Sequence, residues 1–560
     1  MHAFQDDTLS VPSPRGVGQN GRGPQQPAPN VSTPQTVLTR VLLLGSLLTG
    51  AISHGYHLFL YPLYITDEGI YMERAWSVLR EGLFSPYTYY YDHAPAGWLV
   101  IASWVALLPH QFEAFGNAIN TGRVLMLLVH LASVYLLFQT TRRLSGSLMA
   151  AVVACFFFNL SPLAVYYQRQ VLLDNLMVFW VLLSLYLASS DDRRILTPLL
   201  SGLALGMGVL TKENAIFFMP VIGYLLYSKV RPRGNYRFAL SFWFFGAFSI
   251  ISLYFLYAVL KNELLPAHLS FNLNQPPAAH VSLLYTIWQQ LHRAQGGILD
   301  PHSLFWTFSL DAWLPKDTFL LAGGAGAMLI NLYLGLRDRK HHQGELIASL
   351  LALSYIFYLV RGSVMLEFYV VPLVPFLAMN IAMLVNRLPL PETRGLGWLF
   401  GIARTAILAV FFAVLLLPAG GYLLVHDQFG KVVPHDLYKL PLTPLQEEQL
   451  TFIRQHIPPS AHVIMDDDLW LQLHDVAPVY PWAHSHWNAS GDPAVRDKYF
   501  GGGDWHSIDY IVMSNRMLIA MQQNDTDRGE DYILLALQNA KPIWQLTHGG
   551  VSLAIYQVQK

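Results

Sequence analysis

Apolar runs close to the length of a membrane span recur along most of the sequence. A helix needs ~20 apolar residues to cross ~30 Å of hydrocarbon. We count about eleven such runs between Val37 and Val425. The predicted spans are roughly residues 36–62, 119–140, 148–166, 171–189, 196–211, 213–228, 237–259, 318–336, 345–360, 366–386 and 399–425. We therefore expect a polytopic α-helical membrane protein.

The composition is typical of a protein whose partner is the lipid bilayer, and it disfavours nucleic acid as a partner. Charged residues make up 13% of the 560 residues, roughly half of the ~25% found in soluble domains. The 35 Lys and Arg balance the 36 Asp and Glu, for a net charge of −1, so no basic excess favours nucleic acid. The single cysteine, Cys155, excludes an intramolecular disulfide and a thiolate metal cage.

The basic residues predict the orientation of the chain. Short loops rich in Lys and Arg stay on the cytoplasmic side, and the basic clusters fall in alternate loops between the predicted spans. We expect a multi-pass protein of the cell membrane, with a disordered, cytoplasmic N-terminal tail at residues 1–35. Residues 64–118, 260–316 and 426–560 then lie outside. The basic clusters are Arg142 with Arg143, Arg193 with Arg194, Lys229 with Arg231 and Arg233, Arg337 with Arg339 and Lys340, and Arg387 with Arg394.

Two segments outside the membrane carry structure of their own. The apolar run 97–108 is short for a span, and its Trp98 and Trp104 favour a helix lying along the outer interface. Residues 426–560 contain a helical pattern near 445–456 and four strand-like runs, AHVIMD, IDYIVMS, PIWQL and VSLAIYQV. This pattern predicts a small extracytoplasmic α/β domain beside a transmembrane domain over residues 36–425.

Several charged residues lie at the outer ends of the spans. A charge within a span costs ~2.5 to 3.5 kcal/mol, so such residues pair or line an aqueous cavity. Each also has a structural alternative: Asp67 as a helix cap, Arg169 paired with Asp174, Lys212 with Glu213 in a solvated turn, Arg361 as an interface anchor. A cavity with carboxylates, cations, Tyr and Trp suits a sugar carried on an anionic lipid. The residues are Asp67, Glu68, Asp92, His93, Arg123, Arg169, Asp174, Lys212, Glu213, Arg361 and Glu367.

Five motifs in order resemble one superfamily. They are the Asp67-Glu68 pair after the first span, DHAPAGW, YYQRQVLLD, LTK and FYVVPLVPFLAM. The pattern is similar to the lipid-linked-sugar glycosyltransferases of the GT-C type, in the branch of protein O-mannosyltransferases and lipid A aminoarabinose transferases. The likeness spans roughly residues 36–390, and relatives often have His-Pro-Pro where this chain has His93-Ala94-Pro95. It implies a GT-C fold, a polyprenyl-phosphate sugar donor and an acceptor reached from outside.

The resemblance and the chemistry suggest roles for the charged residues. Transfer breaks the bond between the anomeric carbon and a phosphate oxygen, so cations must hold the departing phosphate and a carboxylate must activate the acceptor hydroxyl. We expect Asp67 as general base and Glu68 as a second catalytic residue that orients substrate. A single displacement would invert the anomeric centre. Phosphate binding falls to Arg169, Lys212 and Arg361, with Asp174 setting Arg169, and the supporting residues are Asp92, His93, Asp174, Glu213, Glu367 and Tyr369.

Other functions are compatible with a polar membrane cavity. A transporter or flippase of lipid-linked glycans is the main alternative, although the sequence has no internal repeat of the kind typical of secondary transporters. A non-catalytic glycan receptor is a third. No cofactor is certain, and no metal ligand set is predicted, which leaves a divalent cation open. The acidic run Asp466 to Asp468 follows a predicted strand and is interpreted as a loop.

Overall fold

The computed structural model describes most of the chain between residues 34 and 560. The described residues are 34–192, 194, 196–266, 281–292, 298–361, 365–387, 424–426, 432–434, 441–514, 517, 518, 521, 531–548 and 551–560. They belong to two compact units, Met1–Val41 and Leu42–Lys560. Several predictions lie outside the described residues: the tail up to residue 33, most of the last span, Arg193 and Arg394, and parts of the 260–316 loop.

Six of the described helices are long and apolar enough to cross a membrane: Thr36–Gly55, Ala118–Ser145, Tyr236–Leu260, Phe319–Arg337, Gln343–Val360 and Glu367–Asn386. Four shorter apolar helices accompany them: Ala96–Ala106, Leu148–Leu160, Leu173–Ala188 and Leu196–Thr211. These helices confirm the predicted polytopic helical protein. The count of eleven spans stays a prediction, and Leu424 and Val425, placed in the last span, belong to a short strand, β1 (Leu424–His426).

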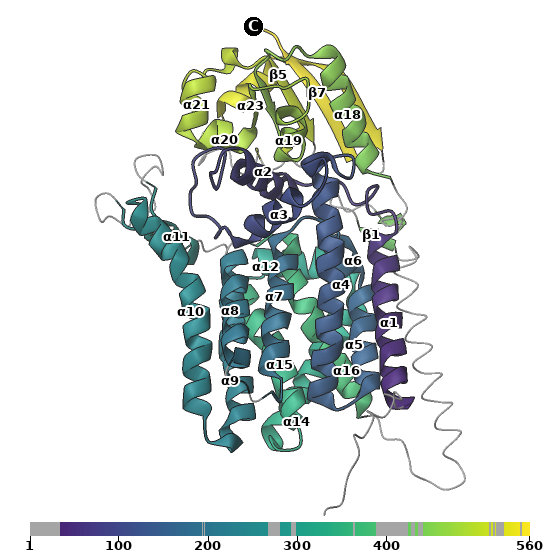
Figure 1. Cartoon of the computed structure of the whole chain (residues 1–560). Coiled ribbons are helices and arrows are strands. Elements are labelled where there is room, and N and C mark those ends of the chain that lie inside the picture. Colours follow the sequence, from purple (N-terminus) through teal and green to yellow (C-terminus); the bar gives the residue numbers. More distant parts are fainter. Residues whose placement is uncertain are drawn as a thin grey trace, which may run out of the picture. The chain divides into compact units, whose positions relative to one another are not determined.

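The helical region contains segments of very different length (Figure 1). Its helices are α1 (Pro34–Gly55), α4 (Ala118–Ser145), α5 (Leu148–Leu160), α6 (Pro162–Tyr167), α7 (Leu173–Ala188), α8 (Leu196–Thr211), α9 (Met219–Val230), α10 (Tyr236–Leu260), α11 (Leu283–His292), α12 (Leu304–Thr307), α13 (Leu314–Lys316), α14 (Gly324–Arg337), α15 (Gln343–Val360) and α16 (Val374–Asn386). Short 3-10 helices η1 (Gln111–Glu113), η2 (Glu213–Phe218) and η6 (Glu367–Leu373) lie at helix ends.

Glycines allow the closest helix contacts in this region. A Cβ on Gly202 of α8 would lie 2.0 Å from the Trp243 carbonyl oxygen of α10. One on Gly246 of α10 would lie 2.6 Å from the Leu199 carbonyl oxygen of α8. Small residues let helix backbones approach in a bilayer, where packing drives association. The pair α8 and α10 is therefore held by backbone contact.

Helices α2 (Thr66–Arg80) and α3 (Ala96–Ala106) form the first of the predicted outer segments (Figure 1). α2 begins directly after Ile65, which places Asp67 and Glu68 in its first turn, where carboxylates favour the helix dipole. The run predicted to lie on the membrane interface is α3, but Trp98 is fully buried, with the Arg74 guanidinium 4.9 Å from its ring centroid. Trp98 is thus a packing residue, and the prediction that it marks an interfacial face is wrong.

The C-terminal region is the predicted α/β domain. Its sheet has the strand order β4-β3-β5-β7-β6, in which β3 pairs in parallel with β4 and β5, while β7 pairs antiparallel with β5 and β6. The strands are β3 (Val463–Met465), β4 (Ala483–Ser485), β5 (Tyr510–Ser514), β6 (Ala540–His548) and β7 (Val551–Val558). The helices are α18 (Thr443–His456), α19 (Trp470–His474), α20 (His486–Gly491), α21 (Pro493–Tyr499) and α23 (Asp531–Gln538), and a second short strand, β2 (Val432–Pro434), pairs with β1.

The α/β domain contacts the segment that leads into α2. Gln446 of α18 accepts a hydrogen bond from the Tyr64 amide at 2.8 Å and donates one to the Tyr64 carbonyl at 3.1 Å. The Thr66 hydroxyl donates to Asp466 at 2.8 Å. A Cβ on Gly69 would lie only 2.2 Å from the Asp467 carbonyl oxygen, in the turn η8 (Asp467–Leu469). The domain therefore fixes the start of α2, where the candidate catalytic residues lie.

Candidate active site

One face of α2 carries Asp67, Tyr71 and Arg74, because residues three and four apart lie above one another on a helix. The Tyr71 hydroxyl donates a hydrogen bond to Asp67 Oδ1 at 3.3 Å. Asp67 is half-buried, and Tyr71 is buried. Burial, together with the charges of Asp67 and Asp174, raises the pKa of Tyr71 well above its usual range. Tyr71 thus stays protonated and orients the Asp67 carboxylate.

Arg74 is held by Asp92, which lies in the loop before α3. One guanidinium nitrogen, Nη2, donates to both oxygens of Asp92, at 3.0 and 2.9 Å. Burial alone would raise the pKa of Asp92, but the charges of Arg74 and His93 lower it below its usual range. Asp92, predicted as a supporting residue, is therefore the ionised partner of an arginine to which the sequence assigned no role.

His93 and Glu213 form a second contact beside Tyr71. The Ala94 amide donates to Glu213 Oε1 at 2.7 Å, and His93 Nδ1 lies 3.4 Å from Oε2. The His93 ring centroid is 6.3 Å from that of Tyr71. Burial opposes protonation of His93, but the hydrogen bond and charge of Glu213 raise its pKa above the usual value. The structure thus brings His93 and Glu213 together at the N-terminal end of η2.

Lys212 and Asp174 form a buried ion pair in this cluster. Lys212 Nζ lies 2.5 Å from Asp174 Oδ2, and their side chains are 3% and 0% exposed. The ammonium also lies 4.1 Å from the Tyr369 ring centroid. Asp174 was expected to set Arg169, and this expectation is corrected by the structure: the carboxylate pairs with Lys212.

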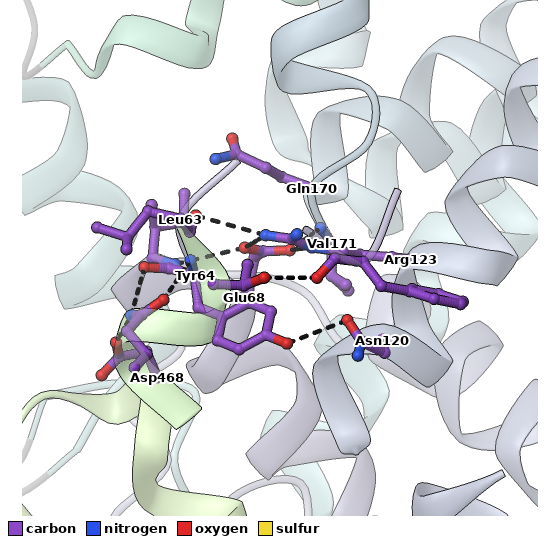
Figure 2. Close-up of polar contacts among 12 residues, drawn as sticks. Leu63, Tyr64, Glu68, Asn120, Arg123, Gln170, Val171 and Asp468 are labelled. Atoms are coloured by element: carbon purple, nitrogen blue, oxygen red, sulfur yellow. Dashed lines mark hydrogen bonds and ion pairs between the residues drawn. The ribbon is translucent and has the colours of Figure 1, made fainter. Parts of the chain in front are cut away.

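Glu68 does not face the cluster. Figure 2 shows its carboxylate against the Arg123 guanidinium, with Nε to Oε1 at 2.9 Å and Nη2 to Oε2 at 2.7 Å. The Val171 amide donates to Oε1 at 2.9 Å, and both charged side chains are 0% exposed. A carboxylate enclosed in this way has no open oxygen for a substrate. Glu68 therefore anchors α2 to α4, and its role in orienting substrate stays a prediction.

Three other predicted residues contact groups outside this cluster. Arg169 donates to the Ser53 carbonyl oxygen of α1 at 2.5 Å. Arg361 is exposed, with its guanidinium 5.1 Å from the Tyr358 ring centroid. Glu367 accepts from the Tyr167 hydroxyl at 2.8 Å and from Lys316 at 3.2 Å.

The cluster joins predicted and unpredicted residues. Tyr71 and Arg74 link the predicted residues of the cluster, which are Asp67, Asp92, His93, Asp174, Lys212, Glu213 and Tyr369. Helical spacing could have found Tyr71 and Arg74, since they follow Asp67 by four and seven residues. Lys316 gave no such signal, because it pairs with Glu367 from a distant part of the sequence. Among the described residues, no group of three or more His, Cys, Asp or Glu side chains could hold a metal ion.

Comparison with known proteins identifies the fold of the chain that carries this cluster. The model of the dolichyl-phosphate-mannose-protein mannosyltransferase family matches residues 92–260. The structure of ArnT from Cupriavidus metallidurans bound to undecaprenyl phosphate is similar over 94% of this chain and 99% of that chain, with a TM-score of 0.56 and 14% identity. Oligosaccharyltransferase AglB from Archaeoglobus fulgidus, in complex with an inhibitory peptide and a dolichol-phosphate, is similar over 94% of this chain and 75% of that chain, with a TM-score of 0.52 and 12% identity.

The chain has the GT-C fold. The resemblance predicted from the five motifs is thereby confirmed, and so is the predicted combination of GT-C helices with a C-terminal α/β region. No curated protein sequence matches the chain. The family model covers the part of this GT-C protein that holds Asp92, His93, Asp174, Lys212 and Glu213.

Proposed function

We propose that this GT-C protein transfers a sugar from a polyprenyl-phosphate donor to a hydroxyl of an extracytoplasmic acceptor, with inversion at the anomeric carbon. One observation carries the proposal: the buried Tyr71 hydroxyl donates to Asp67 and also feels the charge of Asp174, the partner of Lys212. A carboxylate base and a cation in one polar cluster can serve the attacking hydroxyl and the departing phosphate of a displacement. The fold shared with ArnT, which was solved with undecaprenyl phosphate, supports a polyprenyl-phosphate donor.

Asp67 is proposed as the general base. Its carboxylate takes the proton from the acceptor hydroxyl as the oxygen attacks the anomeric carbon, and the bond from that carbon to the phosphate oxygen breaks. The hydrogen bond from Tyr71 fixes the orientation of this carboxylate. Attack from the face opposite the phosphate inverts the anomeric centre.

Lys212 is proposed to hold the phosphate. An ammonium has three N–H donors, and the described contacts use one of them, for Asp174. The remaining donors suit a phosphate oxygen, whose charge grows as the sugar leaves. Asp174 fixes the lysine before the donor binds. Arg169 and Arg361 stay proposals for the same role at the edges of the site, and Lys316 joins them as a cation near Tyr167.

The test is an assay of purified protein with a radiolabelled polyprenyl-phosphate sugar and a membrane extract as acceptor. Asp67→Asn should lower kcat by about 10²- to 10⁴-fold, the usual contribution of a general base. Glu81→Gln, at the exposed end of the same helix, should keep the activity. Retained activity in Asp67→Asn would contradict the role of Asp67.

Lys212→Ala should raise KM for the donor more than KM for the acceptor. An equal effect on both substrates would contradict the phosphate role. Cleavage of the bond between sugar and phosphate in the donor also distinguishes a transferase from a flippase. A flippase would move the donor across the membrane without cleaving it.

A further inference from the structure

A polar cavity lies away from the proposed active site, between residues 64 and 112–120 of the helical region and helices α18 and α19 of the α/β domain. It encloses about 450 Å³, within the ~300–1,000 Å³ range of small-ligand pockets. Trp76 and Arg80 of α2 bind Asp475 in its wall, at 2.8 and 3.4 Å. Trp76 follows Asp67 by nine residues, about half a turn around the helix axis. The cavity and Asp67 thus lie on opposite faces of α2.

Two side-chain amides in the wall of the cavity carry hydrogen-bonding groups that no described residue uses. Gln472 is 5% exposed, and its side-chain amide has no hydrogen-bond partner within the described part of the chain. Asn120 is also 5% exposed, and its Oδ1 accepts from the Tyr64 hydroxyl at 3.1 Å, which leaves its NH₂ group without a described partner. Polar groups of side chains this deeply placed are normally satisfied by protein, by water or by a ligand. Both side chains line the cavity and offer donors and acceptors to it.

Charge in the cavity selects the kind of ligand. Glu113, Glu447 and Asp475 line it together with Arg454, and Arg80 pairs with Asp475 from outside the lining, so one negative charge remains in excess. Glu447 Oε1 has only long contacts of 3.5 Å, to the Tyr64 hydroxyl and Asn117 Nδ2. An anionic ligand would be repelled here, whereas hydroxyl groups can donate to carboxylates and bond amides in both directions. Phe112 and Leu450 add an apolar side.

We propose that this cavity is a second binding site that takes an uncharged saccharide unit. Glu447 and the Gln472 amide bond its hydroxyls, the Asn120 NH₂ group donates to one of them, and the apolar side contacts a ring face. The site is separate from the reaction at Asp67 and does not rest on the proposed function. Its saccharide comes either from the acceptor or from another glycan of the cell envelope.

Binding to the full-length protein in detergent can be followed by saturation-transfer NMR. Mannobiose and maltose serve as neutral probes, and a sulfated disaccharide serves as the anionic probe. At least one neutral probe should bind, and the sulfated one should not. Glu447→Ala and Gln472→Ala should weaken neutral binding about tenfold, which corresponds to about 1.4 kcal/mol. Glu448→Ala is the matched control, since Glu448 is the next exposed residue of α18 and lies outside the lining.

The outcomes separate this site from the reaction. Asp67→Asn should leave saccharide binding unchanged, so that loss of transfer and loss of binding are independent results. A raised acceptor KM in Glu447→Ala identifies the acceptor as the source of the saccharide, and an unchanged one identifies another glycan. Absence of binding by both neutral probes would overturn the proposal, as would preference for the sulfated probe or full binding by both cavity variants.

Discussion

At the level of single residues, burial decides which charged side chains can do chemistry. Glu68 and Asp67 are neighbours in the first turn of α2, yet Glu68 is 0% exposed and bonded twice to Arg123, whereas Asp67 is half-buried beside Tyr71. A helix turns about 100° per residue, so adjacent residues face different surroundings. Glu68 faces α4, and Asp67 faces the cluster. The Asp-Glu pair therefore divides into an anchor and a proposed base.

Glu68→Gln tests the role of the anchor. The substitution leaves the buried Arg123 guanidinium without a counter-charge, which should cost about 3–5 kcal/mol of stability. We expect a clearly lower thermal midpoint in detergent, with any residual activity per folded molecule retained. Glu448→Gln, at an exposed position, should change the stability by less than about 0.5 kcal/mol. A Glu68→Gln protein that melts like the wild type would contradict the buried pair.

The sequence predicted which charged residues belong to the cluster better than it predicted which of them form ion pairs. Asp174, Lys212 and Glu213 stood out because charge is expensive near a span, and the structure brings all three to the cluster. The partner of Asp174 could not be predicted, since Arg169 is five residues away along the chain and Lys212 is 38 residues away, directly after α8. The prediction for Trp98 was wrong for a similar reason. A tryptophan in an apolar run marks a membrane interface only if its side chain is exposed, and the Trp98 side chain is buried beside Arg74.

At the level of elements, the contact between α2 and η8 places the proposed base. Gly69 is the point of closest approach, because any side chain there meets the Asp467 carbonyl oxygen. Local patterns predicted β3, β5, β6 and β7 from four apolar runs, AHVIMD, IDYIVMS, PIWQL and VSLAIYQV. They did not reveal β4, because its residues, Ala-His-Ser, form no apolar run. The docking of η8 on α2 depends on residues about 400 positions apart and left no local signal.

Gly69→Ala should disturb this contact. Its Cβ would fall 2.2 Å from a backbone atom, so α2 or η8 must move, and overpacking of this kind typically costs about 1–3 kcal/mol. We expect a lower thermal midpoint and loss of transfer, because Asp67 moves with α2. Gly326→Ala in α14 is the control, since no atom lies within 4 Å of its Cβ. Equal behaviour of the two variants would contradict the close approach.

The stability of the contact between α2 and η8 should depend on pH. Burial and the charge of Asp466 raise the pKa of Asp467 to about 7. The folded state then holds a proton that the unfolded chain releases above about pH 4. The stabilisation that this bound proton gives the folded state is complete below about pH 4 and is lost as the pH rises through about 7.

The thermal midpoint should therefore fall between about pH 5 and pH 8. Burial and the charge of Asp467 also raise the pKa of Glu73, so both carboxyl groups act in the same direction. Asp467→Asn should flatten the slope, because the amide mimics the protonated acid, and Asp497→Asn at an exposed position of α21 should keep it. A midpoint that rises over this pH range would show that the sign is wrong.

At the level of the whole molecule, the predicted orientation stays open to a direct test. The chain has a single cysteine, Cys155, which is buried, so the wild-type protein gives little background in thiol labelling. Glu448→Cys introduces a thiol on the α/β domain, and Arg339→Cys introduces one in a predicted cytoplasmic loop. Both positions are exposed. A membrane-impermeant maleimide should label the first in intact cells and the second only after lysis, and the reverse pattern would invert the topology.

The central claim is a group transfer from a polyprenyl phosphate, and the balance of products tests it most directly. Purified protein is incubated with a donor labelled in both sugar and lipid, together with acceptor. We expect one free polyprenyl phosphate for each sugar found on acceptor, with the opposite anomeric configuration and neither product in Asp67→Asn. Donor that remains intact while it crosses the bilayer, or sugar transferred at the same rate by Asp67→Asn, would contradict the account.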